Sequence, residues 1–372
     1  MAHIRKVDRP KPWVVSWRVH GKYRSRSFAR KVEAEAFEAS IEDASRNRGV
    51  LVDPHDGRVT VEDWSEEWIT IAAPDLKPKT LASYRSLLRS RILPTFGRSP
   101  IAEIRPGDVD AWVAGMKADG LSPSRIRQAH VVLSTMLDLA VRHDRIARNV
   151  AHGADLPQLR RREAAYFEPA QVDGIQSAAP TSDRPFLAVQ GLLGLRFGEA
   201  AALRRRSVDL MHRRLHVTES LAEISGQLIF GRTKTHADRE VPVPPSVLTM
   251  LSEHLEAVAP DADALLFTSA RGLPLRYSRF RPTVWVPLLD ELGLPRVGMH
   301  ALRHSAAARM TAGWTPKAVQ QVLGHRSVAF TLTQYGHLLS DDLDAFAKAL
   351  DSISGGTAGV QTLPVPPARA AE

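Results

Sequence analysis

The sequence contains no cysteine, and only ten of its 50 Lys and Arg residues are lysine. Without cysteine the chain has no disulfides, no thiolate metal ligands and no cysteine nucleophile. No apolar run approaches the roughly 20 residues that span a bilayer, and the first residues lack the apolar core of a secretory signal. We therefore expect no membrane segment and residence in the cytoplasm.

Positive charge is in excess. The formal net charge is +9 and the pI is near 10.0, which favours a polyanionic partner such as nucleic acid. Residues 1–31 carry ten Lys or Arg and a single acid, Asp8. The length of 372 residues predicts roughly two or three domains.

The N-terminal residues have the pattern of a small sheet with one helix. A hairpin is predicted over residues 12–28, with a turn at His20-Gly21. Helical spacing follows over Lys31–Arg48, with an apolar face made by Val32, Ala36, Phe37 and Ile41. A module of this kind with arginines on its strands fits insertion of β-strands into a DNA groove. We expect it over residues 1–50, followed by a linker.

A helical region begins at residue 59 and extends to residue 156. A capping box at Thr60 to Asp63 opens the first helix, whose predicted inward side chains are Trp64, Trp68 and Ile71. The other helices are predicted over Lys79–Ile92, which would end before Pro94, over Pro106–Lys117, and over Ser122–Val141 with Val131 among its packing residues. These lengths predict a compact four-helix domain, followed by a basic linker.

The remainder, residues 164–350, mixes helices with one short sheet. Its strands are predicted at Arg214–Ser220, Gln227–Arg232 and Arg239–Val243. The tail, residues 351–372, is rich in Gly, Pro and Ala, and we expect it to be disordered. The predicted fold class is multidomain α+β: a β-sheet plus helix module, a four-helix domain, and a mixed α/β, mainly helical domain with a short antiparallel sheet.

One lysine is isolated. Lys234 is the only lysine between Lys117 and Lys317, and it lies in a predicted turn between two strands. A partly desolvated ammonium can give up a proton, whereas a guanidinium stays protonated. Lys234 is therefore a candidate proton donor, although a lysine in this position, taken alone, is more often a solvated loop residue.

Lys234 belongs to one of five short motifs in the chain. In order they are Gly194-Leu195-Arg196-Phe197-Gly198-Glu199, Thr233-Lys234-Thr235, His300-Ala301-Leu302-Arg303-His304, Leu323-Gly324-His325, and Tyr335. In this order and spacing the chain resembles the tyrosine recombinase (phage integrase) family over residues 165–350. The four-helix segment is similar to the core-binding domain of that family, and the N-terminal module is similar to its arm-type DNA-binding domain.

The resemblance implies six catalytic residues: Arg196, Lys234, His300, Arg303, His325 and Tyr335. It implies a site-specific recombinase that cleaves and religates DNA through a 3′-phosphotyrosyl intermediate and so integrates or excises a mobile element. Two of the six, Arg196 and Arg303, would hold the scissile phosphate.

The remaining roles follow from the same resemblance. His325 would donate to a nonbridging oxygen, and His300 would act as a base or a further donor. Tyr335 would attack phosphorus while Lys234 protonates the 5′-hydroxyl leaving group. Near these residues, Glu199 would support Arg196, and we expect a packing role for His304.

The charge pattern agrees with metal-free chemistry. Metal-dependent nucleases hold Mg²⁺ with clustered carboxylates, but residues 300–335 contain no Asp or Glu. Arginines that clamp phosphate oxygens and aimed hydrogen-bond donors can stabilise the developing charge instead. We therefore expect no metal, ATP or other cofactor. His300 and His304 share a helix face, but the zincin pattern requires Glu where Ala301 stands.

The implied partner is double-stranded DNA with core and arm sites. Recombination of two duplexes implies a homo-oligomer on DNA, expected to be a tetramer, and allows accessory DNA-bending or directionality factors. A predicted helix over Asp341–Leu350 either docks on a neighbouring protomer or packs on its own domain. Two alternatives remain: a type IB topoisomerase that acts on one duplex, and a catalytically silent DNA-binding regulator.

Overall fold

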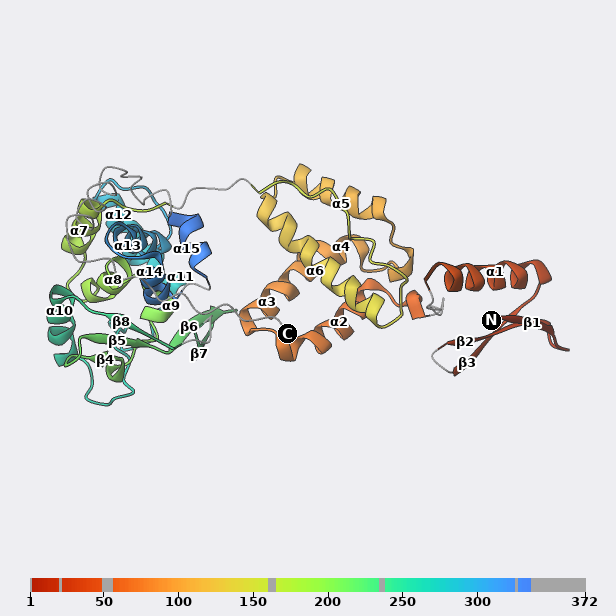
Figure 1. The fold of residues 1–372 in the computed structure, drawn as a ribbon, viewed down its shortest axis with the longest axis horizontal. Coiled ribbons are helices and arrows are strands. Elements are labelled where there is room, and N and C mark those ends of the chain that lie inside the picture. Colours follow the sequence, from red (N-terminus) through yellow and green to blue (C-terminus); the bar gives the residue numbers. More distant parts are fainter. Residues whose placement is uncertain are drawn as a thin grey trace, which may run out of the picture. The chain divides into compact units, whose positions relative to one another are not determined.

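The computed structural model describes residues 2–19, 22–48, 56–159, 165–233, 238–324 and 327–335. The chain divides into two compact units, Met1–Arg162 and Glu163–Glu372. In its described part the protein is mixed and mainly helical, with small antiparallel sheets (Figure 1). No helix in these ranges is long and apolar enough to cross a membrane.

The first residues form a three-stranded antiparallel sheet covered by a helix. Its strands are β1 (His3–Lys6), β2 (Trp13–Val19) and β3 (Lys22–Phe28), in that order, and the helix is α1 (Lys31–Arg48). The predicted hairpin and helix are confirmed. Strand β1 was not predicted, because four residues of mixed charge and exposure carry no alternating pattern.

The predicted apolar face of α1 is partly wrong. Val32 is 74% exposed and Ala36 is also exposed, whereas Ala34, Phe37 and Ile41 are buried. The buried three follow the spacing i, i+3, i+7, which keeps them on one side of the helix, and Val32 and Ala36 lie off that line. Aromatic packing sets the face, since the Phe37 ring meets the Trp17 ring edge-on at 5.2 Å.

The rest of the first unit is a helical bundle with its own apolar core. Its helices are α2 (Val61–Ala72), α3 (Pro78–Leu87), α4 (Leu93–Phe96), α5 (Pro106–Ala118) and α6 (Pro123–Arg142). The predicted cap of the first helix is confirmed, because the Thr60 hydroxyl accepts from the Asp63 backbone N–H at 3.1 Å. Trp64 and Trp68 are buried, as expected.

Three expectations for this bundle are wrong. Pro94 does not end a helix: the chain continues from α3 through a π-helical turn, Leu88–Ile92, into α4. In a π turn each backbone N–H donates to the carbonyl five residues back instead of four. This change takes place directly before Pro94, so the helix continues although Pro94 has no N–H to donate. Ile71 is 42% exposed because it lies at the margin of the buried stripe of α2, and Val131 is 50% exposed because it lies on the face of α6 opposite the buried residues.

The second unit surrounds two small sheets with helices. Its helices are α7 (Pro169–Ala178), α8 (Arg184–Gly191), α9 (Phe197–Ala200), α10 (Pro245–Glu256), α11 (Tyr277–Phe280), α12 (Val286–Glu291), α13 (His300–Gly313), α14 (Pro316–Leu323) and α15 (Val328–Tyr335). Its strands are β4 (Val208–Asp209), β5 (Arg214–Val217), β6 (Glu219–Ile224), β7 (Gln227–Arg232) and β8 (Arg239–Pro242).

The single predicted sheet is wrong, because the strands form two ladders. Strands β4, β5 and β8 make one antiparallel sheet, and among the described residues β6 pairs with β7 alone. The predicted strand Arg214–Ser220 is therefore two strands. Leu215 and Val217 of β5 are fully buried in the main core, whereas the residues of β6 and β7 are mostly half-buried or exposed. The two sheets therefore differ in burial: the first packs into the core and the second lies nearer the surface.

Helix α13 is the central element of this unit. It contacts α7, α8, α14 and α15 (Figure 1). Residues on α13 are therefore held from several sides, and the motif His300 to His304 lies in its first turns. The predicted turn at His20-Gly21, the helix over Asp341–Leu350 and the tail 351–372 lie outside the described residues.

Candidate active site

The first motif forms a tight turn into α9. Gly194 has φ +74°, a conformation that favours glycine, and a Cβ there would lie 2.4 Å from the Leu323 side chain. The Arg196 backbone N–H donates to Glu199 Oε2 at 3.0 Å, and the Arg196 guanidinium donates to Oε1 at 2.7 Å. The predicted support of Arg196 by Glu199 is confirmed.

Glu199 also binds two further arginines. Arg239, the first residue of β8, donates to both carboxylate oxygens at 3.1 and 2.7 Å. Arg303 on α13 lies 3.9 Å from the same carboxylate. Glu199 is 1% exposed, so one buried carboxylate contacts three guanidinium groups.

The charge of Glu199 is strongly stabilised. Burial alone would raise the pKa of this carboxyl, but the hydrogen bond and charge of Arg239, with the charges of Arg196 and Arg303, lower it to about 2. Glu199 is therefore ionised at neutral pH, and it offsets part of the repulsion among the three arginines.

Arg303 is almost wholly enclosed, at 2% exposure. Its guanidinium donates to the backbone carbonyls of Gly194 at 2.6 Å and Leu323 at 2.7 Å. Burial and then the charge of Arg196 lower its pKa, and the charge of Glu199 opposes this shift. Arg196 is more accessible to solvent than Arg303, because 29% of its side chain is exposed.

Two histidines and the tyrosine complete the cluster. His300 and His304 lie one turn apart on α13, with ring centroids at 4.6 Å. Desolvation by the surrounding protein, then the charges of His304, Arg303 and Arg196, lower the pKa of His300 to about 4. Tyr335 is 4% exposed, and His304 Nδ1 lies 2.5 Å from its hydroxyl.

Four of the six predicted residues are thus brought together: Arg196, His300, Arg303 and Tyr335. The other two, Lys234 and His325, lie outside the described residues. Their described neighbours adjoin the cluster, because β8 begins at Arg239 and a Cβ on Gly324 would lie 3.1 Å from the Arg239 side chain.

Sequence reasoning missed two members of the cluster. His304 packs against the rings of His300 and Tyr335, as expected, and in addition it contacts the Tyr335 hydroxyl, which was not expected. Arg239 was expected only to begin a strand, yet it binds Glu199 and also donates to the Val322 carbonyl at 2.9 Å. A pattern signal existed for His304, which stands in the motif itself, whereas nothing in the sequence links Arg239 to Glu199.

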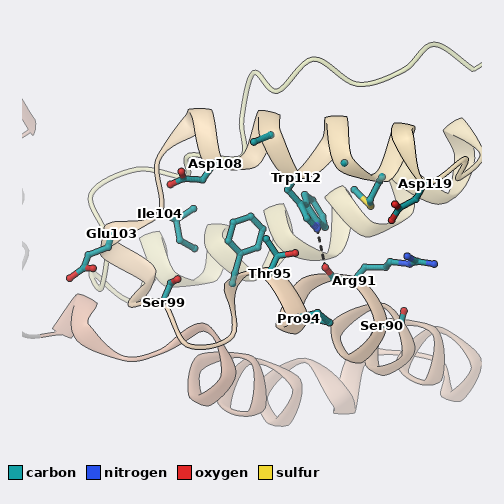
Figure 2. A pocket seen from close by; sticks show the side chains of 14 residues that line it. Ser90, Arg91, Pro94, Thr95, Ser99, Glu103, Ile104, Asp108, Trp112 and Asp119 are labelled. Carbon is teal, nitrogen blue, oxygen red and sulfur yellow. Dashed lines mark hydrogen bonds between the residues drawn. The ribbon is translucent and has the colours of Figure 1, made fainter.

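A separate hollow of about 710 Å³ lies between α5 and the α4 segment of the bundle. Figure 2 shows Trp112 at its wall, where the indole N–H donates to the Arg91 carbonyl at 2.9 Å. Its lining includes the carboxylates of Glu103, Asp108 and Asp119. Because carboxylates repel phosphate, this hollow does not suit phosphate chemistry, and the arginine cluster does.

The described residues contain no group of three or more His, Cys, Asp or Glu side chains that could hold a metal ion. The donors around Tyr335 are guanidinium and imidazole groups instead. Such a set suits an anionic ligand rather than a divalent cation.

Comparison with known proteins gives the family. Residues 166–341 match the model described as the phage integrase family, and residues 60–117 match the phage integrase N-terminal SAM-like domain. The integrase of Mycobacterium phage D29 is 30% identical over 274 residues, which cover 72% of each chain. The chain belongs to the phage integrase family. It is a tyrosine-type site-specific recombinase, and the alternatives of a single-duplex topoisomerase and a silent regulator are not favoured.

Solved structures share the fold of this recombinase. The Tn1549 transposon integrase in complex with a circular intermediate DNA aligns with a TM-score of 0.69 at 22% identity, over 79% of this chain and 99% of that one. A lambda integrase from a tetramer bound to a Holliday junction aligns with a TM-score of 0.60 at 18% identity, over 87% and 95%.

The Glu199 network predicts a pH-dependent stability. A carboxyl whose pKa falls from 4.5 to about 2 on folding stabilises the recombinase above pH 4.5, and this contribution of about 3 kcal/mol is lost as the pH falls through 2. Glu199→Gln should therefore be less stable than the parent at pH 7, and the difference should narrow steadily below pH 4.5. Unfolding temperatures between pH 3 and 7 test this.

The matched control is Glu253→Gln, an exposed carboxylate on α10. The unfolding temperature of this variant should match that of the parent at every pH. If the unfolding temperatures of Glu199→Gln and the parent differ by the same amount at every pH tested, the ionic role of Glu199 is contradicted.

Proposed function

We propose that the recombinase cleaves and rejoins duplex DNA through a 3′-phosphotyrosyl link at Tyr335. The observation that carries the proposal is that the Tyr335 hydroxyl lies in one cluster with Arg196, Arg303 and two histidines. Attack of this oxygen on phosphorus builds negative charge on the nonbridging oxygens, and the arginines supply the positive charge that stabilises it. The covalent link keeps the bond energy for religation, so ATP is not consumed.

Each remaining residue has a proposed role. The guanidinium groups of Arg196 and Arg303 hold the scissile phosphate. His300, which is exposed at the start of α13, and His325 donate to its oxygens. Lys234 protonates the departing 5′-oxygen.

The proposed domain organisation follows from the predicted boundaries. Residues 1–50 bind arm-type DNA, residues 59–156 bind the core site, residues 164–350 carry the chemistry, and residues 351–372 form a tail. The separate apolar cores of the sheet module, the bundle and the second unit support this division.

The proposed assembly is a homotetramer on DNA that joins two duplexes and so integrates or excises a mobile element. The lambda integrase that shares the fold is a tetramer bound to a Holliday junction. The chemistry agrees, because strand exchange between two duplexes needs four cleavages. Accessory DNA-bending or directionality factors would act on the DNA between core and arm sites.

Replacing Tyr335 with Phe should abolish covalent attachment and preserve DNA binding. The probe is a core duplex selected by covalent capture from a random-sequence pool, with a nick beside the cleavage position so that a short fragment diffuses away and traps the adduct. The assay contains EDTA and no ATP, because side chains replace a metal in this proposal.

Tyr277→Phe is the matched control, since Tyr277 lies in the same unit and is 39% exposed. It should form the adduct normally. An adduct on Tyr335→Phe, or a strict need for added Mg²⁺ in the cleavage step, would refute the proposal.

Lys234→Ala should be slow on normal DNA and rescued when sulfur replaces the 5′-bridging oxygen. Sulfur is a good leaving atom that hardly needs protonation, so loss of the proton donor matters little. Arg196→Ala should be slow on both substrates, because it stabilises the phosphate oxygens. Cleavage rates on the two duplexes measure this.

Lys234→Arg separates charge from proton donation. Arginine keeps the charge but, with a pKa above about 12, donates its proton poorly. Lys234 would be only a phosphate contact if Lys234→Arg cleaves normal DNA at the parent rate, or if sulfur fails to rescue Lys234→Ala.

A fragment that starts at Val59 should bind the core duplex with a weaker dependence of affinity on salt. Residues 1–31 carry ten cations, and each phosphate contact that is lost removes counterion release from the binding equilibrium. Titrations at several salt concentrations give the slope. The same slope and the same footprint for fragment and full chain would rule out DNA binding by residues 1–50.

A further inference from the structure

His304 lies against the nucleophile itself. Its Nδ1 is 2.5 Å from the Tyr335 hydroxyl oxygen, and the two rings are 5.9 Å apart at an angle of 50°. The two residues come from different helices, α13 and α15, which pack on each other. The contact therefore depends on the tertiary fold rather than on neighbourhood in the chain.

The environment of Tyr335 makes this contact important for proton movement. The phenol ring packs in a small apolar cluster with Ala307, Val319 and Leu323. A proton that leaves so buried an oxygen needs an acceptor within hydrogen-bonding distance. Nδ1 of His304 is at that distance.

Burial keeps both partners neutral before reaction. Burial and then the charge of Arg303 lower the pKa of His304, so its imidazole is neutral at neutral pH, and the tautomer with the proton on Nε2 offers the Nδ1 lone pair to the phenol. Burial raises the pKa of Tyr335 to about 12, against the charges of Arg303 and Arg196. A neutral phenol donating to a neutral imidazole is the arrangement from which proton transfer starts.

We propose that His304 is the catalytic base that accepts the Tyr335 proton during strand cleavage, an inference that rests on the proposed function. The O–H bond of Tyr335 breaks as its oxygen bonds to phosphorus, and the proton passes to His304 Nδ1. The bond from phosphorus to the 5′-oxygen breaks, and that oxygen takes its proton from Lys234. On religation the imidazolium returns the proton to Tyr335.

The positions of the two histidines divide their roles. His300 is exposed at the start of α13, where DNA can reach it, whereas His304 is half-buried one turn further and faces the phenol. The base, His304, therefore lies beside the Tyr335 hydroxyl, and His300 keeps the role of a hydrogen-bond donor to the phosphate.

The test varies the acidity of the nucleophile in the full-length chain. Tyrosine or a ring-fluorinated tyrosine, whose phenol is more acidic, is placed at position 335 by amber suppression. Each form is combined with His304→Ala, His304→Asn or His300→Ala. The cleavage rate on the nicked core duplex is measured, and unfolding temperature and duplex binding confirm that each variant is folded.

With tyrosine at 335, His304→Ala should lower the rate about 100-fold, the order expected for loss of a general base. With the fluorinated tyrosine the loss should shrink to less than about tenfold, because a more acidic phenol needs less help from a base. His304→Asn keeps an acceptor near the Nδ1 position without its basicity, so it should behave like His304→Ala. His300→Ala should lose rate equally with either nucleophile.

Four results would overturn the proposal. Cleavage by His304→Ala at or above the parent rate would show that His304 only restrains Tyr335. A full rate with His304→Asn would show a positioning role, and an equal loss with both nucleophiles would show no role in deprotonation. Rescue of His300→Ala by fluorination would make His300 the base. If the proposed function itself fails, Tyr335→Phe still forms the adduct and fluorination changes no rate.

Discussion

One buried carboxylate, that of Glu199, allows three guanidinium groups to share a small volume. Arg196, Arg239 and Arg303 would repel one another at these distances, and each would lose hydration on burial. The carboxylate offsets both costs, because it accepts hydrogen bonds from two of them and lies 3.9 Å from the third. The geometry of the proposed phosphate site depends on this arrangement.

The same network joins parts of the chain that are far apart in sequence. Its arginines come from the start of α9, from β8 and from α13. Arg239 and Arg303 also donate to the carbonyls of Val322 and Leu323 at the end of α14. In sequence α15 and Tyr335 follow α14, so Arg303, which would bind the phosphate, also holds the end of the helix that precedes the proposed nucleophile.

The sequence predicted the chemistry better than the packing. The motifs pointed to Arg196, Arg303 and Tyr335, and the structure brings these three residues into one cluster. Arg239 and the contact of His304 with Tyr335 were missed, because both arise where separate helices and strands meet, and local patterns carry no record of such contacts. For the same reason the inward face of α1 and the division of one predicted sheet into two ladders were wrong, since aromatic packing and burial decided them.

The most direct test of the site is to locate the DNA on the protein. The adduct formed on the nicked core duplex is digested with trypsin and nuclease, and the modified peptide is sequenced by mass spectrometry. We expect the nucleotide on Tyr335, in the peptide that begins at Ser327. A nucleotide on Tyr277, which lies in a different tryptic peptide, or on any residue other than tyrosine, would contradict a site built around Tyr335 and the Glu199 network.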